Sequence, residues 1–154
     1  MPTKIGKQGR VNTTEILKKI STTKDIKSFI TRNLDYFRLP KLNKYLLELC
    51  EAKGIEAKEI IKKTDMNRQY LNEILKGKKA NPSRDHIICL AFGLGLDYKE
   101  CQRLLKVARH SQLYSKLKRD AVIIYCLQNK KSFYETEEIL FDLKLPTLRG
   151  GRYG

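Results

Sequence analysis

A row of hydrogen-bonding side chains lies on one face of a helix that the sequence predicts at about residues 67–75. Residues three or four apart share a helix face, and Leu71 and Ile74 mark the face that would be buried. Guanidinium, amide and carboxylate groups in such a row can pair with a fixed pattern of donors and acceptors on a partner. The outward face consists of Arg68, Gln69, Asn72, Glu73 and Lys76.

A second short helix, predicted from about Glu56 to Lys63, precedes this one. Between the two lies a turn, Thr64-Asp65-Met66, after which Asn67 can cap the second helix. Gly77 follows the second helix and is the residue type that most often ends one. Two short helices joined by a tight turn form the helix-turn-helix shape.

Three further helices complete a predicted five-helix core over residues 41–109. The first runs from Lys41 to Gly54, a left-handed C-cap residue. Ser83 can cap another, and Asp97 with Glu100 forms a capping box before the last. Apolar residues recur at helical spacing almost throughout the chain, so the predicted fold class is all-α.

Additional helices are predicted on both sides of this core. Residues 1–11 form a flexible basic arm, residues 12–40 an N-terminal helical pair with starts at Asn12 and at Thr22 with Asp25, and Pro40 closes the pair. Residues 110–145 form a C-terminal helical extension, with helices from about Ser115 to Leu127 and from Ser132 onward, and residues 146–154 a flexible tail. The acidic residues of the last helix are expected to be solvated or to dock a basic partner. These are Glu135, Glu137, Glu138 and Asp142.

The charge of the chain indicates a polyanionic partner. It has 154 residues, enough for one sizeable core, with 32 Lys and Arg against 17 Asp and Glu and a formal net charge of +15. Nucleic acid is the first candidate, because Lys and Arg that neutralise phosphates supply most non-specific affinity. A basic surface that only maintains solubility is the alternative for charge taken alone.

The segment Glu59 to Lys78 resembles, without a gap, the helix-turn-helix of the Xre/Cro/lambda-repressor-like family. The loop Asn81-Pro82-Ser83 and the glycine-rich ending Ala91-Phe92-Gly93-Leu94-Gly95-Leu96 resemble the same family's fourth helix and its flanks. The similarity extends over about Leu42 to Ala108. It implies a lambda-repressor-like DNA-binding domain whose recognition helix, at about residues 67–75, enters the major groove of double-stranded DNA.

The resemblance also implies roles for individual residues. Those that match base-reading positions are Arg68, Gln69, Asn72 and Glu73, and each good pair would discriminate by roughly 1–3 kcal/mol. Arginine suits guanine, Asn and Gln suit adenine, and Glu can accept from cytosine or instead pair with a nearby Lys. Those expected at phosphates are Lys58, Asn67, Lys76, Lys78, Lys79, Asn81, Ser83 and Arg84.

Two departures from the family pattern are visible. The family has Gly in the turn where this chain has Asp65, which tolerates the required backbone angles better than most residues. The family's buried Arg and Glu pair would fall at Cys50 and Leu75. Packing is thus expected to replace an ion pair between the first and third core helices.

No catalytic site, metal site or cofactor is predicted, so the chain is not expected to be an enzyme. His86 and His110 are isolated, and the four cysteines are far apart and next to aliphatic residues, as expected for reduced core thiols. No run reaches the roughly 18 apolar residues of a membrane span, and Met1 to Gly9 lacks a secretory signal. We therefore expect a cytoplasmic protein with no membrane contact.

Three functions stay open from the sequence. The first is a transcriptional regulator, with a repressor favoured, that binds an inverted repeat as a homodimer with half-sites ~34 Å apart. The second is an antitoxin-like or defence-associated adaptor, which binds its own operator while the N- or C-terminal helices hold a protein partner. The third is an interaction module that has kept the fold without the DNA-binding face; Arg68 and the basic loop argue against it.

Overall fold

The computed structural model describes residues 13–37 and 39–149, and every regular element within these ranges is helical. The all-α expectation is therefore confirmed for this part of the chain. None of its helices is long and apolar enough to cross a membrane. The chain divides into two compact units, residues 1–40 and residues 41–154, with the division at Pro40.

The N-terminal unit contains α2 (Thr13–Thr22), α3 (Ile26–Arg32) and the 3-10 helix η1 (Leu34–Phe37). Asp25 alone caps α3, since its carboxylate accepts hydrogen bonds from two backbone N–H groups, whereas the expected start at Thr22 is the end of α2. The predicted cap of α2, Asn12, and the basic arm lie outside the described residues.

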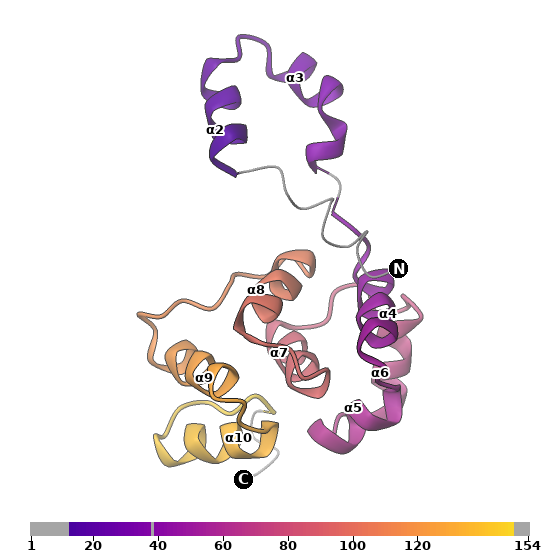
Figure 1. Ribbon diagram of the computed structural model, residues 1–154, viewed down its shortest axis with the longest axis vertical. Coiled ribbons are helices and arrows are strands. Elements are labelled where there is room, and N and C mark those ends of the chain that lie inside the picture. The colour runs from indigo at the N-terminus through magenta and orange to yellow at the C-terminus, as the bar shows by residue number, and fades with distance from the viewer. Residues whose placement is uncertain (1–12, 38, 150–154) are drawn as a thin grey trace. The chain divides into compact units, whose positions relative to one another are not determined.

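The second unit begins with three helices, α4 (Leu42–Lys53), α5 (Ala57–Thr64) and α6 (Arg68–Leu75) (Figure 1). Gly54 ends α4 in the left-handed conformation, with φ of 64°, as predicted. Asn67 caps α6, as also predicted. Helix α5 begins and ends one residue later than expected, a difference of the size usual at helix ends.

Helix α7 (Arg84–Gly93) forms the centre of this unit and packs on α5, on α8 (Tyr98–Val107) and on α10 (Phe133–Asp142). Its residues from Ile87 to Gly93 are all buried. The closest approach is at Gly93, where a Cβ atom would lie 2.7 Å from Cγ2 of Ile60 in α5. The absence of a side chain at Gly93 therefore sets how tightly α7 and α5 pack.

The C-terminal helices α9 (Lys118–Gln128) and α10 (Phe133–Asp142) belong to the same unit, and α10 packs on α9, α5 and α7 (Figure 1). The capping boxes predicted at Asp97 and Ser132 are present. Helix α9 starts three residues later than the predicted Ser115. The carboxylate of Asp120 in its first turn accepts the backbone N–H of Tyr114, which precedes the helix, at 2.9 Å.

Residues 146–149, which the sequence predicts as the start of a flexible tail, make hydrogen bonds to the rest of the unit. The carboxylate of Glu137, itself buried, accepts the backbone N–H groups of Leu148 at 2.6 Å and Arg149 at 3.2 Å, and the Leu148 side chain is buried. Arg119 donates to the carbonyl of Pro146 at 2.8 Å. These partners replace water around the backbone and hold the segment against the unit. Residues 150–154 lie outside the described part.

Candidate nucleic-acid interface

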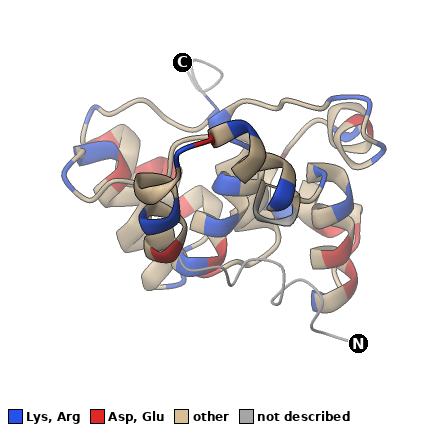
Figure 2. Cartoon of the chain, turned by 90° about the horizontal axis from the view of Figure 1, so that it is seen from above, with Lys and Arg blue, Asp and Glu red and all other residues tan. Residues whose placement is uncertain are grey.

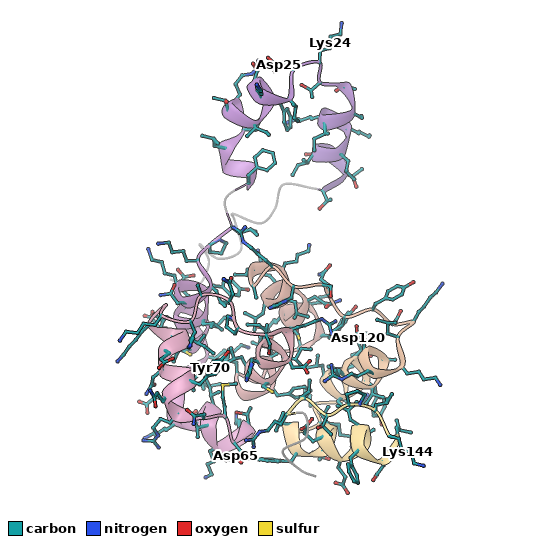
Figure 3. The ribbon with its side chains drawn as sticks, turned by 180° about the vertical axis from the view of Figure 1, so that it is seen from behind. Lys24, Asp25, Asp65, Tyr70, Asp120 and Lys144 are labelled. Carbon is teal, nitrogen blue, oxygen red and sulfur yellow. The ribbon has the colours of Figure 1, made fainter. Side chains whose placement is uncertain are left out.

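The turn between α5 and α6 is fixed by backbone geometry at one residue and by a cap at another. Asp65 has φ of 54°, and its N–H donates to the carbonyl of Ile61 at 2.6 Å. Two residues on, the side chain of Asn67 accepts the N–H of Tyr70 at 2.9 Å (Figure 3, where Asp65 and Tyr70 are labelled). This places an Asp at the left-handed position where glycine is the usual residue.

One face of α6 is buried and the other is open to solvent. Leu71 and Ile74 have no exposed surface, whereas Arg68, Gln69 and Asn72 are all exposed. Helix α6 is therefore amphipathic, with the buried and exposed residues that the sequence spacing predicts. Within the described residues no ion pair engages Arg68, so its guanidinium is available to a ligand.

Glu73 is held by its neighbours. Its carboxylate accepts from the amide of Gln69 at 3.3 Å and lies 3.9 Å from the ammonium of Lys79. The backbone carbonyl of Glu73 also accepts the N–H groups of Lys78 and Lys79, at 2.9 and 3.1 Å. Glu73 thus orients the loop after α6, and the pairing with a lysine is the alternative role expected from the sequence.

The loop from Lys76 to Asn81 is exposed throughout and carries three lysines. Gly77 enters it with φ of 82°, a conformation that suits glycine. Lys76 and Lys78 make no ion pair among the residues that the structure describes, while Lys79 has only the long contact to Glu73. The loop is a compact basic surface directly after the open face of α6.

Four other residues predicted to contact phosphates differ in whether their side chains already have a partner in the protein. Asn67 and Ser83 use their side chains to cap α6 and α7, although both residues are exposed. Lys58 is exposed and pairs with Glu56 at 3.3 Å. Asn81 is exposed in the basic loop.

Arg84 is predicted to contact a phosphate, but its guanidinium is bound by other groups of the protein. It donates to both carboxylate oxygens of Asp120, at 2.9 and 3.2 Å, and to the carbonyls of Ser111 and Gln112. Its side chain is 23% exposed. A phosphate could bind it only at the expense of these bonds, so Arg84 serves to join α7 to α9 rather than to form part of the open basic surface.

Sequence reasoning missed the pairing of Tyr70 with His86. Their rings lie 4.6 Å apart, and His86 Nδ1 is 2.7 Å from the hydroxyl of Ser83, the cap of α7. Tyr70 is half-buried. This ring contact joins the first turn of α6 to the start of α7, and no sequence pattern signals it.

A second missed contact joins the end of the described chain to the turn before α6. The guanidinium of Arg149 lies 2.7 Å from the Asp65 carboxylate. Arg149 is itself held through its backbone N–H by Glu137 in α10. The turn that precedes α6 is thereby connected to the C-terminal helices, over a sequence separation that no local motif reveals.

Charge by itself does not single out this face. Figure 2 shows Lys and Arg distributed over helices and loops of the chain. Cys50, in α4, and Leu75, in α6, are half-buried, and the two helices pack on each other. No cluster of His, Cys, Asp and Glu suited to a metal ion occurs among the described residues.

Comparison with known proteins gives no relative. No protein-family model matches the chain, and neither a curated protein nor a solved structure matches it.

Proposed function

We propose that this protein binds double-stranded DNA in a sequence-specific manner, with α6 as the helix that reads the major groove, and that it acts as a transcriptional regulator. The observation that supports this most directly is the open face of α6. Arg68, Gln69 and Asn72 are exposed together on a helix whose other face is fully buried. These side-chain types pair bidentately with guanine or adenine edges, and a short helix fits the major groove.

The basic loop supports the same proposal through the phosphate backbone. Lys76, Lys78 and Lys79 follow α6 directly and are exposed. Contacts of this kind fix register and orientation without reading sequence, and they make affinity fall with salt. Glu73 would act indirectly, by holding Gln69 and the loop backbone in place.

Selection of duplex sites from a random DNA library tests the proposal. We expect enrichment of one motif, and a palindrome with half-sites about one helical turn apart if the protein binds as a homodimer. A library that shows no enrichment, with binding lost at physiological salt, would contradict sequence-specific recognition.

A second candidate function, a protein-partner adaptor that also binds its own operator, is favoured by the N-terminal unit. Of its large apolar side chains among the described residues, only Phe29 is buried, while several others are between about two-fifths and three-fifths exposed. Such a concentration of exposed apolar surface is typical of an interaction site. The exposed residues are Leu17, Ile20, Ile26, Ile30, Leu34, Phe37 and Leu39.

Affinity purification from the native host distinguishes this role. A stoichiometric partner retained by the full chain and lost with Leu17→Asp and Ile30→Asp would support an adaptor. Retention of the partner by that double variant, or no partner at all, would contradict it. The matched control is Lys18→Asp with Lys27→Asp, which changes charge on the same helices without changing the apolar face.

A further inference from the structure

A cavity of about 830 Å³ lies between α5, the ends of α7 and α9, and the start of α10. None of its lining residues belongs to the proposed DNA interface. Its volume falls in the range of sites that hold small organic molecules. The cavity joins helices that are distant in sequence, since α5 contributes Lys62 and Lys63 while the segment before α10 contributes Lys130 and Lys131.

The inner wall of the cavity is apolar and partly aromatic. Phe92 and Phe133 meet edge to face with ring centroids 6.4 Å apart, and Leu96 and Leu127 complete the wall. All four residues are between 2% and 8% exposed. Packing therefore holds their side chains in place, and each presents only a small part of its surface to the cavity. A wall of this kind suits a flat or aliphatic ligand body.

The rim of the cavity is basic. Lys62, Lys63 and Lys130 are exposed and have no ion-pair partner in the described ranges, and Lys131 has only a 3.9 Å contact with Glu135. All four lysines line the cavity together with the apolar wall. A ligand that complements both the apolar wall and the basic rim has an anionic head and an apolar body.

The acidic residues of the lining do not cancel this charge. Two of the three, Asp97 and Glu135, have their carboxylates bound to backbone N–H groups at helix starts, at 2.8 and 3.0 Å. Those helix ends carry partial positive charge that offsets the carboxylates. The lining holds four lysines and three acids, a formal excess of one positive charge, and one of these lysines, Lys131, lies near Glu135.

We propose that this cavity is a binding site for a small amphipathic organic anion, of the class of aromatic or short aliphatic acids. The apolar body lies against Phe92 and Phe133, and the anionic head lies between the lysines of α5 and Lys130. The site is independent of DNA binding, so either proposal can fail without the other.

The fluorescent sulfonate 8-anilinonaphthalene-1-sulfonate tests this site in the full-length protein, with the neutral N-phenyl-1-naphthylamine as the matched uncharged probe. The key variant carries Lys62→Gln, Lys63→Gln and Lys130→Gln, all at exposed positions where folding should be unaffected. The control variant removes the same charge elsewhere with Lys99→Gln, Lys106→Gln and Lys118→Gln.

We expect saturable one-to-one binding of the sulfonate, with a dissociation constant at least about fivefold higher in the key variant and unchanged in the control. The neutral probe should bind both variants equally. Amide resonances of Gly95 and Ser132, both in the lining, should shift on addition of the sulfonate, and that of Gly54 should not.

Three results would overturn the proposal. The first is sulfonate binding that the lysine substitutions leave unchanged, with shifts only in the N-terminal unit, which would indicate adhesion to exposed apolar residues. The second is displacement of the sulfonate by a duplex oligonucleotide, which would assign the lysines to a phosphate backbone. The third is binding of an acidic glutamate-tyrosine peptide but not of the sulfonate, which would indicate a protein segment as the occupant.

Discussion

Arg84, the first residue of α7, and Asp120, near the start of α9, form a two-bonded ion pair with N–O distances of 2.9 and 3.2 Å. Asp120 is buried and also accepts the N–H of Tyr114 (Figure 3). Because Arg84 binds the carbonyls of Ser111 and Gln112 as well, this one side chain fixes the connection that leads into α9.

The substitution Asp120→Ala should strongly destabilise the protein. It leaves the partly buried guanidinium of Arg84 without its counter-charge, and removal of one partner from a buried pair costs roughly 3 kcal/mol. Urea unfolding followed by circular dichroism measures the loss. The control Asp142→Ala, at an exposed acid of α10, should change stability by less than about 0.5 kcal/mol. Equal effects of the two substitutions would refute the structural role of the pair.

Glu137→Ala should release the segment 146–149. The change leaves the N–H groups of Leu148 and Arg149 without acceptors, and each buried unsatisfied group costs about 1–3 kcal/mol. Hydrogen exchange at the Leu148 amide is the direct measurement, and it should accelerate at least tenfold. Glu138→Ala, one residue along and exposed, is the matched control and should leave that exchange rate unchanged.

Gly93→Ala should destabilise the packing of α7 on α5. The added methyl group would lie 2.7 Å from Ile60 and 3.2 Å from Thr64, both buried. Overpacking of a close helix contact costs typically 1–3 kcal/mol. The variant Ile60→Ala removes the Cγ2 atom that the new methyl group would meet, so Gly93→Ala with Ile60→Ala should lose less stability in thermal unfolding than the sum of the two single variants. Additive losses would place the strain elsewhere.

The cysteines should react slowly and unequally in the native state. Burial raises the pKa of the Cys89 and Cys101 thiols to about 12, and it also raises the pKa of Cys50 and Cys126. A raised pKa means little thiolate at pH 8, so reactivity should increase with pH. Cys50 is half-buried and the other three are buried. Titration with a thiol reagent at pH 8 should label Cys50 first and all four only after denaturation; fast labelling of Cys89 would contradict the burial.

Local features of this fold were predictable from local sequence. The caps at Asn67, Ser83, Asp97 and Ser132 depend on hydrogen bonds within three residues, and the left-handed Gly54 depends on its own backbone. The short range of these interactions explains why spacing alone predicted them. The exposed face of α6 followed for the same reason, because helical periodicity fixes which side chains share a face.

Two of the differences from the sequence-based predictions concern partners that are distant in the chain. Arg84 was expected at phosphate, but its carboxylate partner lies 36 residues away. The segment from Pro146 was expected to be a flexible tail, yet Glu137 of α10 accepts the backbone N–H of Leu148. Which polar groups meet across a core depends on helix packing, and a single sequence carries no direct signal of it.

If α6 reads base sequence, Arg68→Ala and Lys78→Ala should change binding to the selected DNA site in different ways. Affinity is measured for the selected site, for single-base variants of it and for unrelated DNA, at several salt concentrations. We expect Arg68→Ala to relax the preference for one base pair of the site, by roughly 1–3 kcal/mol. Lys78→Ala should weaken binding to all sequences alike and lower the salt slope by about one unit. Identical behaviour of the two variants, or a wild-type protein without sequence preference, would show that α6 does not read base sequence.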